Sequence, residues 1–162
     1  MCFMSLFKKK IPRKWTFGDL PIVKWNAKVN SKYDMETVCK IILTEILKLP
    51  NIELQVVTDD KLVKKFDTDT VEMQAILDSL PMPHKYCLHL RGTLNMSILS
   101  IVCHEMVHLK QYESGDLKLK GTTFYWKGKD YSNIDYWSRP WESEARREQI
   151  DIEKQVKKLY YE

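Results

Sequence analysis

The segment from Ser97 to Gly115, SILSIVCHEMVHLKQYESG, constrains the fold more than any other part of this chain. The residues before its first histidine, ILSIV, are mostly apolar, which is typical of a helix with a buried face. Asn95 or Ser97 can cap the start of such a helix, and Gly115 can end it in a left-handed conformation. We therefore expect a helix that carries polar groups into the protein interior.

Those polar groups are His104, Glu105 and His108, which form an HExxH pattern. Four residues of helix turn through about 400°, so the two imidazoles project in nearly the same direction, one turn apart. Catalytic zinc uses three protein ligands and leaves a fourth position for water. Glu105 lies roughly 100° around the helix, so its carboxylate can accept a proton from that water as the water attacks a carbonyl. The alternative is a structural polar network, in which every buried polar group needs a partner.

A third ligand has to come from another part of the chain, and the segment SRPWESEARRE offers Glu142, Glu144 and Glu148. We expect a helix from Pro140 almost to the C-terminus, because proline suits a first helical turn. Glu142 and Glu144 flank opposite sides of its apolar stripe, so helix geometry does not choose between them. These glutamates could instead simply complement the helix dipole.

The rest of the sequence predicts a mixed α+β domain. Residues 34–49 have the spacing of a helix buried on one side, with Pro50 as its stop. NIELQVVT and KYCLHLRG alternate as strands do, PIVKWNAKV is a short strand or an extended lead-in, and TTFYWKGKDY predicts a hairpin. We read DTVEMQAILDSLPMP as a short helix that starts near Asp69 or Thr70. His84 and His89 are expected to be ordinary polar residues.

Length and composition favour one domain over residues 21–162, preceded by a basic, weakly ordered arm over residues 1–20. The 26 basic and 22 acidic residues give a net charge of only +4, so the basic excess is local to the arm and we do not expect nucleic-acid binding. Four scattered cysteines form no CxxC pair, which argues against a disulfide framework. The sequence shows neither a membrane span nor a secretory signal, so we expect an intracellular protein without membrane partners.

The combination of CHEMVHLKQYESG, FYWKGKDY and RPWESEA resembles the zincin metallopeptidases, most closely the small HExxH proteins encoded by bacteriophages. The resemblance covers Cys103 to Ala145. It implies a zincin-like fold in which a small sheet packs on the HExxH helix and a C-terminal helix supplies the third ligand. Many zincins carry this ligand as Glu-x-x-Ala, which fits Glu142, whereas an alanine directly after the ligand would favour Glu144.

The resemblance implies a zinc-dependent hydrolase, with His104 and His108 as Zn²⁺ ligands, Glu105 as general base, and a protein or peptide as substrate. It also implies a location in the host cytoplasm or in the virion. The sequence has no clear residue to stabilise an oxyanion, although Tyr125, Tyr131 and Tyr136 are candidates. The alternative function is therefore a virion-associated or interaction protein, with phage virion proteins as partners, that keeps the fold without turnover.

Overall fold

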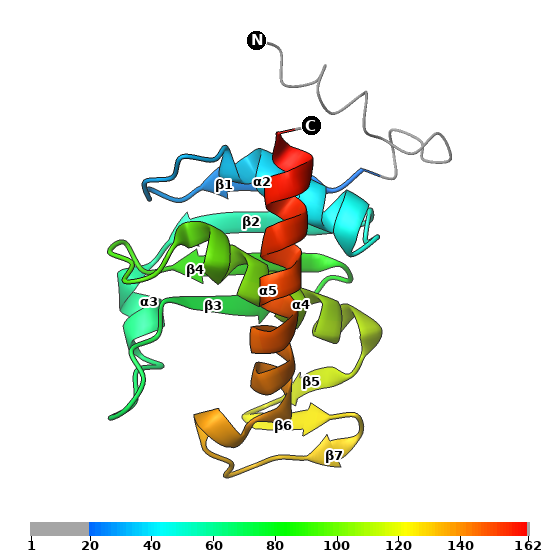
Figure 1. Cartoon of the computed structure of the whole chain (residues 1–162). Helices are drawn as coiled ribbons and strands as arrows, with labels where there is room; N and C mark the ends of the chain where they lie inside the picture. Colours follow the sequence, from blue (N-terminus) through cyan, green and yellow to red (C-terminus); the bar gives the residue numbers. More distant parts are fainter. Residues whose placement is uncertain (1–19, 162) are drawn as a thin grey trace.

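A computed structural model describes residues 20–161, which form a mixed α+β fold. A four-stranded sheet has the order β1-β2-β4-β3, in which β1 (Ile22–Asn26), β2 (Glu53–Thr58) and β4 (Lys85–Leu90) are parallel. The edge strand β3 (Ala75–Ser79) pairs antiparallel with β4. Two long helices, α4 (Ile98–Ser114) and α5 (Pro140–Tyr160), lie in front of the sheet in Figure 1. The predicted arm lies outside the described residues, except for Leu20.

The alternating strands bury one face against the helices. In β2, Leu54 and Val56 are buried, while Tyr86, Leu88 and Leu90 of β4 continue the same face. These side chains join a core with apolar residues of α4, of α5 and of the helical segment between β1 and β2. The expected strand faces of both segments are confirmed.

The first helical segment starts where predicted, but it ends at Ile46 instead of residue 49 and differs in form. It begins as α2 (Met35–Ile41), capped by the Asp34 side chain, and continues as the π-helix η2 (Ile42–Ile46). The amide of Leu47 donates to the carbonyl of Ile42, five residues earlier, at 2.8 Å. Ile42 and Leu43 of this π-helix remain buried in the core.

The expected helix near Asp69 is wrong. Residues 67–74 form an irregular loop, and Ala75–Ser79 form strand β3, because their backbone pairs with β4. The buried Arg91 secures the loop through its guanidinium, which contacts Asp67 at 2.6 and 2.8 Å and the carbonyl of Met73 at 2.8 Å. The short helix α3 (Asp60–Lys64) was not anticipated and begins at an Asp59 cap.

The end of α4 and the hairpin follow their sequence signals, whereas β5 and η3 were not anticipated. Helix α4 ends at Gly115, whose φ of 78° is readily available to glycine. The predicted hairpin is β6 (Thr123–Trp126) and β7 (Lys129–Asp130), and β5 (Leu117–Lys120) pairs with its other side. The 3₁₀ helix η3 (Tyr136–Ser138) then leads into α5.

Helix α5 connects two packing centres. Its first turn inserts Trp141 into an aromatic cluster with Trp126 and Phe124, next to the small sheet. Its later turns place Ile152 and Val156 in the main core. In Figure 1 this helix, orange to red, runs from the small sheet to the level of β1. Among the described residues, no helix has the length and apolar character needed to cross a membrane.

Candidate metal centre

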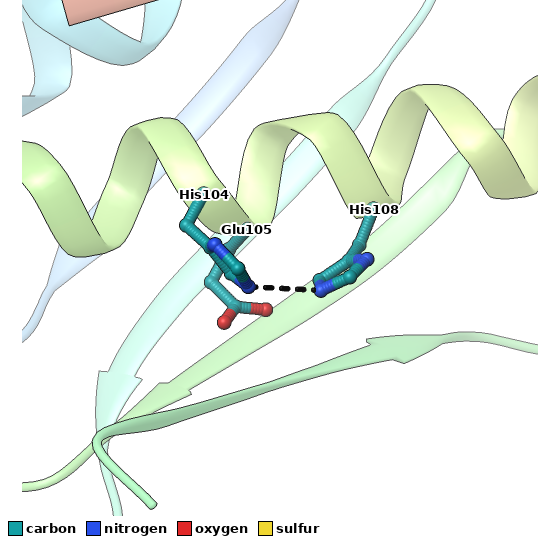
Figure 2. A group of neighbouring side chains, drawn as sticks. All are labelled: His104, Glu105 and His108. Carbon is teal, nitrogen blue, oxygen red and sulfur yellow. Dashed lines mark hydrogen bonds between the residues drawn. The ribbon is translucent and has the colours of Figure 1, made fainter. Parts of the chain in front are cut away.

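The imidazoles of His104 and His108 converge on the cleft side of α4. Their Nε2 atoms lie 3.2 Å apart, and Figure 2 shows both rings and the Glu105 carboxylate on the same side of the helix. The potential ligand atoms of these three residues all lie within 4.8 Å of one another. The one-turn spacing thus brings the side chains together as helix geometry requires.

Helix α5 adds a carboxylate to this pair. Glu142 Oε2 lies 3.0 Å from His104 Nε2, and Glu142 Oε1 lies 3.3 Å from His108 Nε2. The Glu142 side chain is only 9% exposed, so it faces the imidazoles in a largely dry setting. The three side chains therefore converge on one point between the two helices.

The other two glutamates of α5 lie elsewhere. Glu144 Oε2 accepts a hydrogen bond from Gln111 Nε2 at 2.8 Å, and Glu148 pairs with Lys110 on the surface at 2.8 Å. Glu144 is therefore linked to His108 only indirectly, through Gln111. The choice that helix geometry left open between Glu142 and Glu144 depends on how α5 is rotated against α4, which packing determines.

Glutamine side chains orient both imidazoles, and the sequence analysis missed them. His108 Nδ1 lies 2.8 Å from Gln111 Oε1, and His104 Nδ1 lies 3.2 Å from Gln149 Oε1. The Gln111 amide nitrogen donates to the carbonyl of Trp141 at 3.0 Å, which turns its oxygen toward His108. Because an amide oxygen only accepts, each Nδ1 must donate, and a neutral ring then presents the lone pair of Nε2 to the site.

This donor set fits zinc. Two nitrogens that each lie about 2.0–2.1 Å from one tetrahedral zinc are roughly 3.4 Å apart, close to the observed Nε2 separation of 3.2 Å. Two imidazoles and one carboxylate also form a known catalytic ligand set. The residues present therefore fit the metal that the sequence predicts.

Burial and charge shift three protonation equilibria at the site in the absence of a metal. Burial lowers the pKa of His108, but hydrogen bonding to Glu142 and the charges of Glu142 and Glu105 raise it to about 9 overall. Burial alone would raise the pKa of Glu142, yet the hydrogen bonds from both histidines hold it well below its ordinary range. Burial raises the pKa of Glu105. A proton on His108 thus compensates Glu142 where a metal cation could do so instead.

The site opens into a cleft of about 730 Å³. Glu105 and the three converging side chains line it, together with β3, the loop before β3, and the segment around η3. Tyr136, one of three candidate oxyanion donors, lines the cleft and donates from its hydroxyl to Glu142 Oε2 at 3.0 Å. Tyr131 instead packs edge-on against Trp141, and Tyr125 does not line the cleft.

The other histidines lie outside this cleft. His84 pairs with Glu113 at 2.8 Å, and His89 lies between Asp59 and Asp78 at 3.4 and 3.1 Å. Cys103, beside His104, is fully buried among the core residues.

Comparison with protein-family models, curated proteins and solved structures found no match to this chain.

Proposed function

We propose that this protein is a zinc-dependent peptidase of zincin type, with His104, His108 and Glu142 as the metal ligands. The observation that carries the proposal is the convergence of two Nε2 atoms and the Glu142 carboxylate at 3.0–3.3 Å, with both imidazoles oriented by glutamines. A hydrogen bond at the ring nitrogen that faces away from the metal is typical of metal sites, since it fixes the tautomer that can bind a cation.

Zinc in this position would act as a Lewis acid that polarises a substrate carbonyl and makes water more acidic. Glu105 would accept the proton of that water and return it to the leaving amine. Its carboxylate suits this role because it lies beside the imidazoles, and because burial raises its pKa above that of an exposed glutamate. Tyr136 would keep the Glu142 carboxylate in place through its hydroxyl.

The proposal extends to the substrate through the shape of the cleft. The edge strand β3 borders it, and large apolar side chains line it at Phe66, Leu117 and Leu119. An open strand edge beside apolar walls suits an extended peptide better than a small polar molecule. We therefore propose proteins or peptides as substrates.

The test combines turnover with metal content in one matched pair of variants. Zinc-loaded protein is incubated with a peptide library, products are identified by mass spectrometry, and zinc is counted by elemental analysis. Glu105→Gln should lower the cleavage rate by roughly 10²–10⁴-fold while zinc remains bound, since it removes only the proton acceptor. Glu148→Gln, which neutralises a surface glutamate of α5, should cleave like the wild type. Cleavage that survives Glu105→Gln would contradict the mechanism.

A further inference from the structure

Arg139 is a cation in the cleft wall that forms no ion pair with any residue from 20 to 161. Its guanidinium carbon lies 5.4 Å from the ring centre of Phe124, 5.5 Å from that of Tyr136 and 5.9 Å from that of Trp141. Arg139 and these three aromatic residues all line the cleft. The guanidinium therefore lies in an aromatic pocket open to the same space as the candidate metal centre.

One polar atom of this arginine has no partner among the described residues. Its Nε atom is buried and has no hydrogen-bond partner, and within residues 20–161 no carboxylate comes within ion-pair distance of the guanidinium. Nearby Asp135 is engaged elsewhere, with Ser138 Oγ at 2.6 Å and the amide of Trp137 at 3.0 Å. A buried donor without a partner is rare, and the planar fork of a guanidinium matches the two oxygens of a carboxylate.

Arg139 lies close to the reacting centre. Tyr136 connects the two, because its ring contacts the guanidinium while its hydroxyl donates to Glu142 at 3.0 Å. One extended residue of a peptide spans roughly 3.3–3.6 Å, so a group bound at Arg139 belongs to a residue only a few positions from the scissile bond. Arg146 differs, since it stacks on Trp137 but does not line the cleft.

Charge elsewhere in the cleft restricts where an anion can bind. The cleft lining also contains Asp69, Asp78 and Asp135, whose carboxylates would repel an anionic group. Apolar side chains cover much of the remaining wall, and Phe66, Leu119 and Trp137 are each at least half exposed. Among the described residues that line the cleft, Arg139 is the only arginine or lysine, so a ligand that suits this surface is mainly apolar and carries one carboxylate beside Arg139.

We propose that Arg139 and its three aromatic neighbours form a carboxylate-binding subsite, which selects apolar peptides that carry a carboxylate within a few residues of the cleaved bond. The inference rests on the proposed function and narrows its substrate class. Arginine binds carboxylates through two parallel hydrogen bonds, and these are stronger in a site shielded from water. The carboxylate belongs either to the C-terminus of a short peptide or to an acidic side chain, which are chemically equivalent at the guanidinium.

The test measures binding rather than turnover. Probes are acetyl-Ala-Phe-Leu with a free C-terminal carboxylate and the same peptide as an amide, each titrated calorimetrically into zinc-loaded Glu105→Gln protein. The free acid should bind roughly tenfold more tightly. A second pair, acetyl-Ala-Glu-Leu-amide and acetyl-Ala-Gln-Leu-amide, distinguishes an acidic side chain from a C-terminus as the source of the carboxylate. Equal affinities within both pairs would overturn the proposal.

Variants of Arg139 assign the preference to the guanidinium. Adding Arg139→Gln should reduce the acid-to-amide ratio to about one, whereas Arg147→Gln, which removes an exposed cation of α5, should leave it unchanged. A ratio that persists in Arg139→Gln would mean that the carboxylate binds the metal or another cation, and would overturn the assignment. If Arg139→Gln does not fold, Arg139→Lys, which keeps the charge without the planar fork, should lower the ratio severalfold.

Failure of the proposed function is distinguishable from failure of this subsite. Absence of cleavage in every library peptide, together with an Arg139-dependent acid preference, would leave the subsite intact and reject the peptidase. Cleavage of acid and amide peptides at equal rates, with equal binding, would keep the peptidase and reject the subsite.

Discussion

Two of the clusters that pair histidine with carboxylates have sharply different surroundings. In the cleft, Glu142 faces His104 and His108 and is 9% exposed. On β4, His89 lies between Asp59 and Asp78, whose side chains are 37% and 49% exposed. Glutamine oxygens accept from both cleft imidazoles, whereas His89 Nδ1 is buried without a hydrogen-bond partner. The same residue types thus form a converging donor set in one place and a surface ion pair in the other.

The comparison teaches that the residues behind the ligands distinguish a candidate metal site from an ion pair. A carboxylate shared by two imidazoles concentrates donor atoms around one point. A buried carboxylate is costly unless a proton or a cation compensates its charge. Two exposed aspartates on either side of one imidazole remain hydrated and are screened by water. The predictions below separate the two clusters, beginning with the largest effect.

The largest effect is expected from removing one ligand in each cluster. His104→Ala should reduce zinc from near one ion per chain to near zero, because two donors cannot hold the ion against dilution. His89→Gln should keep the wild-type zinc content. Elemental mass spectrometry on both variants, with circular dichroism as a check on folding, makes the measurement. Equal loss in the two variants would reject the cleft as the metal site.

A smaller effect on zinc binding is expected from replacing Gln111, which accepts a hydrogen bond from His108. Gln111→Leu removes the acceptor for His108 Nδ1, so the ring should lose its fixed orientation and zinc affinity should fall roughly 10- to 100-fold. Competition with a fluorescent zinc chelator measures the change. Gln155→Leu, an equal substitution at an exposed position of α5, serves as the matched control. An unchanged affinity in Gln111→Leu would show that packing alone orients the imidazole.

The smallest effect is that of a change of one pH unit. The pKa of His108 in the metal-free protein is raised from 6.5 to about 9, so zinc must displace a proton, and its apparent affinity should rise roughly tenfold per pH unit and level off above about pH 9. The free energy of unfolding of the metal-free protein should instead fall as the pH rises. Because the folded pKa is raised, the stabilisation by this proton is complete below about pH 6.5 and is lost as the pH rises through about 9.

Zinc titrations and thermal unfolding between pH 6.5 and 9.5 check both slopes. The profile of His89→Gln should follow the wild type, because His89 belongs to the other cluster. A zinc affinity that does not change with pH would contradict the assignment of the raised pKa to His108.

Local signals were enough to predict the helix that carries the histidines. Gly115 ends α4 where predicted, and the HExxH spacing places both rings on one side without help from the rest of the fold. The strands β2 and β4 were also predictable, since alternating burial is a local pattern. Strand β3 was not, because its extended form depends on pairing with β4, which lies beyond it in the sequence.

The two glutamines that orient the imidazoles could have been predicted from their spacing in the sequence. Gln111 lies three residues after His108 on the same helix face, and Gln149 lies seven residues, or two turns, after Glu142. Helical spacing from a suspected ligand would have found both. The aromatic pocket of Arg139 had no such signal, because Phe124 comes from β6 and packing alone brings it to the start of α5.

The anchoring of α5 has a consequence for how quickly a bound ion could leave. His104 and His108 are local neighbours, but Glu142 is 34 positions beyond His108 and belongs to a helix whose far turns are anchored in the main core. At its other end the Tyr160 hydroxyl accepts from the Asp34 amide at 3.0 Å. Opening the site requires either fraying of the first turn of α5 or detachment of the whole helix. The residence time of the ion would then depend on how often α5 frays or detaches from the core.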